Sequence, residues 1–259
     1  MASRAVGNIR FAPSKCAPSA GKVEAVHAIE RLRWVAQDCW APAEEVAADA
    51  AFALAEVAEE EPSALLPSCR RLLERHPWCG PLWWVAAHLL ASPDPAAEAE
   101  RRAGQLLGDP TEEILAVELV TAGRAVRRGS LADLVGAEVA VVQVEAVSVG
   151  AMAVDADQRG MLLAARELDL PVWVVAGVGR VLPRGLWQSM VDRSGGGRGG
   201  RAAAAAGSVP RAPSTARSHL STLEGVVKVV GPNGSRSVES ALSAATCPEP
   251  AELTGDRGW

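Results

Sequence analysis

The sequence lacks tyrosine and has only two phenylalanines, although it contains eight tryptophans. It also lacks a P-loop, an H-E-x-x-H motif and a recognisable Ser-His-Asp arrangement. The common signatures of P-loop nucleotidases, zinc peptidases and serine hydrolases are therefore missing. We interpret Trp83, Trp84, Trp173 and Trp187 as core residues, with no cofactor box or base-stacking platform implied.

Cysteine is scarce and scattered. The five cysteines are an odd number without a C-x-x-C pair, which argues against a disulfide framework or a common zinc motif. The closest Cys and His neighbours are Cys69, His76, Cys79 and His88, whose spacing is wide for a metal site. We favour buried thiols in a reducing cytoplasm and predict neither a metal nor a cofactor.

Long apolar runs are absent as well. A membrane span needs about 18 uninterrupted apolar residues, and the most apolar stretch, 139–154, is broken by Gln143 and Glu145. Residues 1–20 mix basic residues and proline without a continuous apolar segment, so we predict a disordered lead-in, not a signal peptide. The expectation is a cytoplasmic protein.

The composition is that of an ordinary globular chain. Of its 259 residues, 49% are apolar and 22% are charged, and the formal net charge is -5. This length supports a buried core in one large domain or two smaller ones. A disulfide miniprotein, a collagen-like repeat and a wholly disordered chain are excluded.

The first half, residues 21–128, is predicted to be a helical domain. Residues 22–60 read as helical, and a clearer helix follows Pro62 and ends at His76-Pro77. Residues 82–90 are apolar nearly all round, which predicts a helix in the middle of a bundle, and further helices are expected over 96–107 and 111–126. The apolar stripe expected in the first region comprises Val23, Val26, Ile29, Leu32 and Trp34.

Residues 129–259 are predicted to form an α/β domain with a parallel sheet. The β-branched run 139–147 indicates a strand buried on both faces, and a helix over 157–169, with Asp157 as N-cap, leads to a second strand at 171–176. A third strand at 226–230 ends in a Gly-Pro-Asn-Gly turn. Residues 194–218 are rich in Gly, Ala and Arg and are expected to be a flexible insertion.

Gly177, Gly179 and Arg180 follow the second strand, where α/β sheets bind ligands. The glycines would let backbone N–H groups approach a phosphate, and Arg180 would pair with it. The third glycine of G-x-G-x-x-G is missing, so a dinucleotide site is disfavoured. A simple turn into the next helix is the alternative.

Two further places are candidates. Glu145 is an acid in an apolar strand, which predicts either a raised pKa and a catalytic acid or base, or a solvated glutamate at the strand edge. Asp157, Gln158, Arg159 and Gly160 begin the crossover helix, whose free N–H groups suit an anion, although a plain helix cap with an exposed Arg159 is the favoured explanation. Arg198, Arg201, Arg211 and Arg217 suggest RNA binding, without interleaved aromatics to support it.

Two stretches resemble the translation initiation factor 2B alpha/beta/delta-like family, which includes sugar-phosphate aldose–ketose isomerases. The segment H-P-W-C-G-P-L-W-W at 76–84 is similar to the family's R-P-T-A-V-N-L-x-W. The stretch 142–160 with 168–176 is similar to its G-A-D-x-V, N-K-x-G-T and P-x-Y-V-x-A-P run. The resemblance implies a helical bundle joined to a shortened Rossmann-like parallel-sheet domain, assembled as homo- or hetero-oligomers.

The departures from the family bear on activity. Glu145 takes the place of the family's catalytic acid only with a short insertion, and the Asn-Lys pair falls on Asp157 and Gln158, so the phosphate-facing lysine is lost. The catalytic cysteine segment, the R-G-A-P-type phosphate loop and the T-R-P-x-x-Q-G stretch have no counterpart, because 126–138 is too short for them.

We therefore expect a non-catalytic relative that acts by binding, in a regulatory or scaffold role, and senses a phosphorylated metabolite or nucleotide. The alternatives are an isomerase that uses Glu145 as general acid/base and an RNA-associated translation factor.

Overall fold

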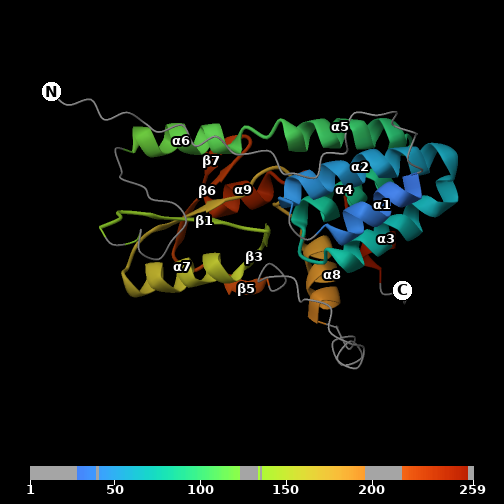
Figure 1. Cartoon of the computed structure of the whole chain (residues 1–259). Helices are drawn as coiled ribbons and strands as arrows, with labels where there is room; N and C mark the ends of the chain where they lie inside the picture. The colour runs from blue at the N-terminus through green and yellow to red at the C-terminus, as the bar shows by residue number, and fades with distance from the viewer. Residues whose placement is uncertain (1–27, 39–40, 123–133, 135, 196–217, 256–259) are drawn as a thin grey trace.

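The computed structural model describes residues 28–38, 41–122, 134, 136–195 and 218–255. The lead-in expected at 1–20, nearly all of the insertion at 194–218 and most of the shortened stretch at 126–138 lie outside these residues. Figure 1 shows a helical bundle on one side and an α/β part on the other, with α5 and α6 in line along one flank. Within the described residues, no helix is both long and apolar enough to cross a membrane.

The bundle is built around one helix that is buried on all sides. Nine of the twelve residues of α4 are buried, and Trp83 is 0% exposed. Prolines at the first turns of η1, α4 and α5 begin these elements, as expected where the first N–H groups have no helical partner. The elements are α1 (Ala28–Gln37), α2 (Ala43–Glu60), η1 (Pro62–Ala64), α3 (Leu65–Arg75), α4 (Gly80–Ala91) and α5 (Pro95–Leu107).

The predicted stripe of the first helical region is partly wrong. Trp34 is 60% exposed and Ile29 is 47% exposed, whereas Ala28, Leu32 and Val35 form the buried face of α1. The buried residues are spaced four and three positions apart, so they share one face of the helix, and Ile29 and Trp34 lie outside that face.

The larger sheet has the strand order β1-β4-β6-β7. β1 pairs with β4 and β4 with β6 in parallel, which confirms the predicted strand–helix–strand unit, and β7 closes the sheet antiparallel to β6. Helix α6 packs on one face, while α7 and α9 contribute to the core on the other. The elements are α6 (Thr111–Thr121), β1 (Ala140–Gln143), α7 (Ala156–Glu167), β4 (Val172–Val175), β6 (Val226–Gly231), β7 (Gly234–Arg236) and α9 (Val238–Ser243).

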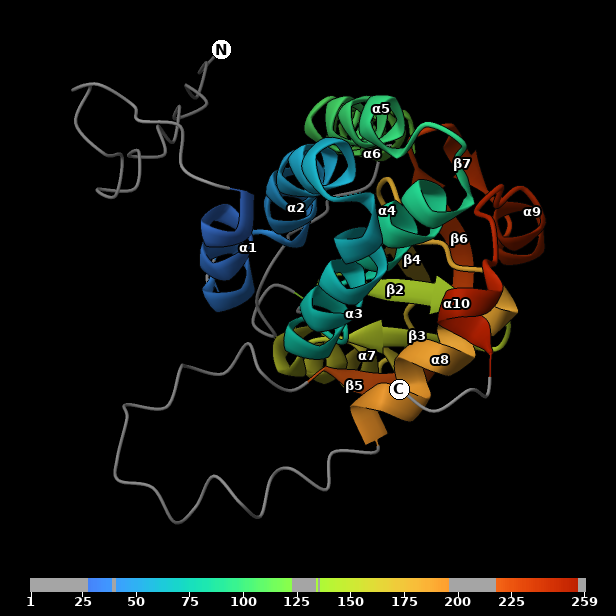
Figure 2. The same ribbon diagram turned by 90° about the vertical axis from the view of Figure 1, so that its right-hand side faces the viewer.

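A second sheet was not anticipated. The apolar run 139–147 leaves β1 at Gln143 and enters β2 (Ala146–Ser148), which pairs antiparallel with β3 (Ala151–Val154) and through it with β5 (His219–Thr222). The expectation of one continuous strand is therefore wrong. The sequence does not reveal the corner at Val144-Glu145, because no glycine or proline marks it. Figure 2 shows β2 and β3 beside α8 (Arg184–Gly195), against which α10 (Ala251–Thr254) packs.

Candidate functional site

A pocket of about 390 Å³ lies at the carboxyl ends of β4 and β6. Its floor is the loop 176–179 that follows β4, and its walls come from α5, α9 and the β6–β7 hairpin. The ends of parallel strands are where open α/β sheets bind ligands, and this volume suits a small metabolite. Gly177 and Gly179, two of the predicted ligand-binding residues, line this pocket.

The charged side chains of the pocket are all basic. Among the described residues that line it, Arg102 and Arg236 carry charge, and no aspartate or glutamate is present. Gln105 and Asn233 add side-chain amides. The lining therefore favours an anionic ligand.

Arg102 is held in place by a buried carboxylate. Glu98, only 5% exposed, accepts a hydrogen bond from Nε of Arg102 at 2.6 Å and also pairs with Arg101 at 2.5 Å. Nη1 of Arg102 donates to Oε1 of Gln105 at 2.9 Å, and its guanidinium lies 4.8 Å from the centre of the Trp84 ring. Arg102 is therefore a fixed part of the pocket wall.

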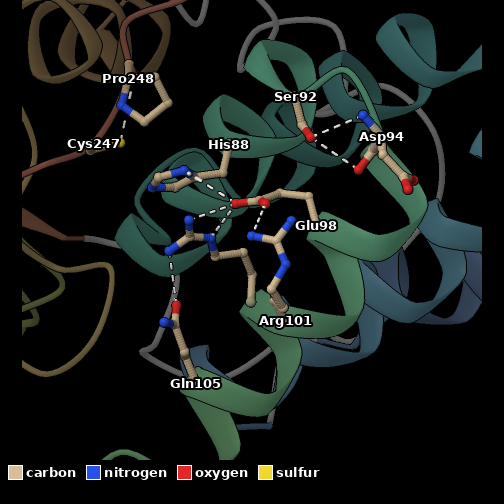
Figure 3. A network of polar contacts seen from close by, with 9 residues as sticks. His88, Ser92, Asp94, Glu98, Arg101, Gln105, Cys247 and Pro248 are labelled. Atoms are coloured by element: carbon tan, nitrogen blue, oxygen red, sulfur yellow. Dashed lines mark hydrogen bonds and ion pairs between the residues drawn. The ribbon is translucent and has the colours of Figure 1, made fainter.

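His88 completes this network, which Figure 3 shows with Glu98, Arg101 and Gln105. Its Nδ1 lies 3.5 Å from Oε1 of Glu98. Burial, reinforced by the nearby charge of Arg102 and opposed by that of Glu98, lowers the pKa of His88 to about 4. The imidazole is thus neutral at pH 7.

The glycine loop, residues 176–179, packs between the bundle and the sheet. The Val178 N–H, which was expected to approach a phosphate, donates instead to Oδ2 of Asp109 at 2.7 Å. A Cβ on Gly177 would overlap this carboxylate, and a Cβ on Gly179 would lie 2.9 Å from Cα of Pro81. Gly179, which also has a positive φ, is therefore required by close packing against the bundle, whereas a side chain at Gly177 would displace the Asp109 carboxylate.

Arg180 faces inward and does not line the pocket. Its Nη2 lies 2.7 Å from Oε2 of Glu44 on α2, and its Nη1 donates to the Val144 carbonyl at 2.6 Å and lies 3.6 Å from Oε2 of Glu145. Two carboxylates already balance its charge, so this geometry does not support the predicted phosphate contact by Arg180.

Glu145 is partly buried where β1 leads into β2. Burial raises its pKa, opposed by the charge of Arg180 and assisted by those of Asp155 and Glu44. A carboxyl group with a raised pKa suits proton transfer. Cys79, the neighbouring thiol, is buried, and burial raises its pKa to about 12, so it carries no thiolate at pH 7.

The predicted site residues at the start of α7 lie elsewhere. The N-cap is Asp155, whose Oδ1 accepts from the Gln158 N–H at 2.7 Å, so the prediction of Asp157 as N-cap is wrong. Oε1 of Gln158 accepts from the Gln143 N–H at 3.0 Å, and Nη1 of Arg159 lies 3.1 Å from Nδ1 of His219. These side chains contact β1 and β5, and neither they nor Gly160 line the pocket.

Sequence reasoning missed Arg102, Arg236 and Asn233. The motif Gly-Pro-Asn-Gly marked the turn that holds Asn233, but no local pattern places α5 beside that turn. Within the described residues, no group of three or more His, Cys, Asp or Glu side chains is arranged to hold a metal ion. Cys69, His76, Cys79 and His88 were the residues considered as a metal site. The imidazole of His76 contacts the Val35 carbonyl.

No protein-family model matches the sequence, and no curated protein is detectably similar to it in sequence. Solved structures are similar in fold. The Pyrococcus horikoshii OT3 translation initiation factor eIF-2B has 15% identity and a TM-score of 0.53, covering 83% of this chain and 98% of its own. eIF2B beta from Chaetomium thermophilum has 13% identity and a TM-score of 0.50, covering 81% and 86%.

A third structure, the tetrameric eIF2B-beta2-delta2 complex from C. thermophilum, has 13% identity and a TM-score of 0.54, covering 83% of this chain and 92% of its own. Together these likenesses show the fold, an N-terminal helical region followed by an α/β part with a parallel-containing sheet. They confirm the initiation factor 2B-like fold expected from the sequence.

Proposed function

Proceeding from this initiation factor 2B-like fold, we propose that the chain is a non-catalytic binding protein that takes a phosphorylated metabolite or nucleotide in the pocket at the ends of β4 and β6. One observation carries the proposal: the pocket is lined by two arginines and by no acid among the described residues. A phosphate monoester supplies the missing negative charge and accepts several hydrogen bonds.

Three observations argue against catalysis. Glu145 does not line the pocket, the Cys79 thiol is protonated at pH 7, and Gln158, at the position of the family's lysine, is bonded to β1. An enzyme of this chemistry needs its catalytic groups and its phosphate anchor around one substrate. Here they are separated or engaged elsewhere, which favours a regulatory or scaffold role.

Thermal unfolding with and without ligand tests binding. Ribose 5-phosphate and AMP should raise the midpoint temperature, whereas ribose and adenosine should not, because only the former carry the phosphate. A ligand at 100 times its Kd stabilises a fold by about 2.7 kcal/mol, which is readily measured. No shift, or equal shifts with the unphosphorylated pair, would contradict the proposal.

Isomerisation is the second candidate, because burial raises the pKa of Glu145 as a general acid would require. Aldose–ketose conversion of ribose 5-phosphate, followed by NMR, decides between the two. Conversion that is lost in Glu145→Gln would show that the chain is an enzyme. We expect no conversion by the unchanged protein or by Glu145→Gln.

We also propose a homo- or hetero-oligomer in the cytoplasm. The structure from C. thermophilum with TM-score 0.54 is a beta2-delta2 tetramer. Light scattering of the purified chain should give a mass above that of one 26.9 kDa copy. A monomer at every concentration would leave only the hetero-oligomer.

A further inference from the structure

Arg236 differs from the other cations near the pocket. Its side chain makes no hydrogen bond or ion pair with any part of the chain that the structure describes, although the residue is partly buried in the lining. Arg102 is held by Glu98 and Gln105, and Arg180 by Glu44 and Glu145. A partly buried guanidinium without a counter-ion keeps its five N–H donors available to a ligand.

The strand pairing turns Arg236 toward the interior of the α7 and α9 side. Side chains alternate along β7, and Ser235 lies opposite Val230, whose side chain packs in the cluster beneath α6 on the other face of the sheet. Arg236 lies directly opposite Val229, whose side chain belongs to the core beneath α7 and α9. Directly opposed residues share a face, so Arg236 lies on the α9 side.

Around it the lining is small and polar. Ala241 of α9, Ala244 just after that helix and Gly234 of the hairpin bring no bulk into the pocket, and Asn233 at the turn adds an amide. The loop on the floor does not compete for an anion, because Asp109 already accepts the Val178 N–H. Of the two arginines in the lining, the one whose guanidinium has no hydrogen bond or ion pair in the described part of the chain is thus on the hairpin side.

We propose that Arg236 is the residue that anchors the ligand's phosphate, and that the β6–β7 hairpin, not the glycine loop, determines recognition of the anion. This inference rests on the proposed binding function and adds its specificity-determining residue. The guanidinium presents two parallel N–H groups to two phosphate oxygens, a geometry that the single ammonium of lysine does not reproduce.

Titration calorimetry on the full chain tests this with ribose 5-phosphate and AMP as probes. Arg236→Gln should weaken binding by about 10- to 100-fold, the range for loss of a hydrogen-bonded charge. Arg236→Lys should retain part of the affinity. Arg71→Gln is the matched control, because Arg71 is exposed on α3, and it should bind as the unchanged protein does.

Without ligand, Arg236→Gln should melt at the temperature of the unchanged protein, because Arg236 has no protein partner to lose. Equal affinity of Arg236→Gln and the unchanged chain would overturn the role of Arg236 and leave the binding function intact. Absence of binding by the unchanged chain would overturn both. If Arg236→Gln binds more weakly but also melts at a lower temperature than the unchanged protein, Arg236 supports the fold, and this result would also overturn its role as the anchor.

Discussion

At the scale of single residues, Glu98 determines the character of one pocket wall. One buried carboxylate contacts Arg101, Arg102 and His88. Because two guanidiniums share it, the cluster retains a net positive charge when His88 is neutral. This charge opposes protonation of His88 and leaves Arg102 attractive to an anion at the same time.

The lowered pKa of His88 predicts a pH-dependent stability. The unfolded chain binds a proton at His88 near pH 6.5, whereas the folded chain binds it only near pH 4. The contribution of His88 to the free energy of unfolding should therefore be fully present above pH 6.5. It should decrease as the pH drops from 6.5 toward 4, by up to about 1.4 kcal/mol per pH unit.

Urea unfolding at pH 7.0 and 5.5 measures the effect. His88→Gln cannot titrate, so it should lose less stability over this interval than the unchanged protein. Equal losses in the two proteins would show that the imidazole titrates alike in the folded and unfolded states.

Tryptophan shows what composition and periodicity can and cannot predict for a residue. Trp83, Trp84, Trp173 and Trp187 are buried as predicted. The first three lie in segments whose neighbours are also apolar, and Trp187 follows the buried Leu186. Trp34 is exposed, because the spacing of its helix allowed two apolar faces and the packing of α1 against α2 and α3 selected the other.

At the scale of elements, α7 is fixed at its start by Asp155. This side chain accepts from the Gln158 N–H, while Asp157, two residues on, is exposed in the first turn. Asp155→Ala should cost about 1 kcal/mol of unfolding free energy. Asp157→Ala, the matched control, loses only a favourable charge near the helix dipole and should cost about 0.3 kcal/mol.

Chemical denaturation of both variants at pH 7 compares these costs. A larger loss for Asp157→Ala would restore the cap predicted from the sequence. Two acids two positions apart give the same local pattern, and only the path of the chain from β3 decides which one lies outside the helix.

Elements with strong boundaries were predictable, and those without were not. α3 ends at the His76-Pro77 pair, α4 is apolar all round, and β4 and β6 are β-branched runs with clear ends. The division of 139–147 between two sheets was missed, because a continuous apolar run is compatible with one strand or two. β3 is short and pairs with β2 through a tight turn, and β5, also short, pairs with β3 only across a long stretch of sequence.

At the scale of the whole molecule, the loop 177–180 holds the bundle against the sheet. Asp109, Pro81 and Glu44 reach it from three different parts of the bundle side. Gly179 has φ of 76° and no space for a Cβ, whereas Gly150 has φ of 82° in open space.

Gly179→Ala should therefore destabilise the protein more than Gly150→Ala. Both substitutions incur about 1 kcal/mol of backbone strain, and only Gly179→Ala adds overlap with Pro81, about 1–3 kcal/mol. Urea unfolding of the two variants measures the difference. Equal losses would mean that the loop can move away from α4 without cost.

The site was only partly predictable from the sequence, because it depends on how the bundle packs against the sheet. The sequence places glycines after a strand, and these do line the pocket, but their proximity to Asp109 and Pro81 depends on how the bundle docks. Arg102 and Arg236 are 134 positions apart, and only the fold brings them to one cavity.

The tightly packed floor has a consequence for evolvability. Substitutions in 177–180 damage the attachment of the two halves, so selection for a new ligand has little freedom there. Asn233 and Arg236 of the hairpin carry no such packing constraint, and a mutational library confined to them should yield altered ligand preference with folding preserved. Diversification of this scaffold is expected to proceed through its outer turn while its inner loop stays fixed.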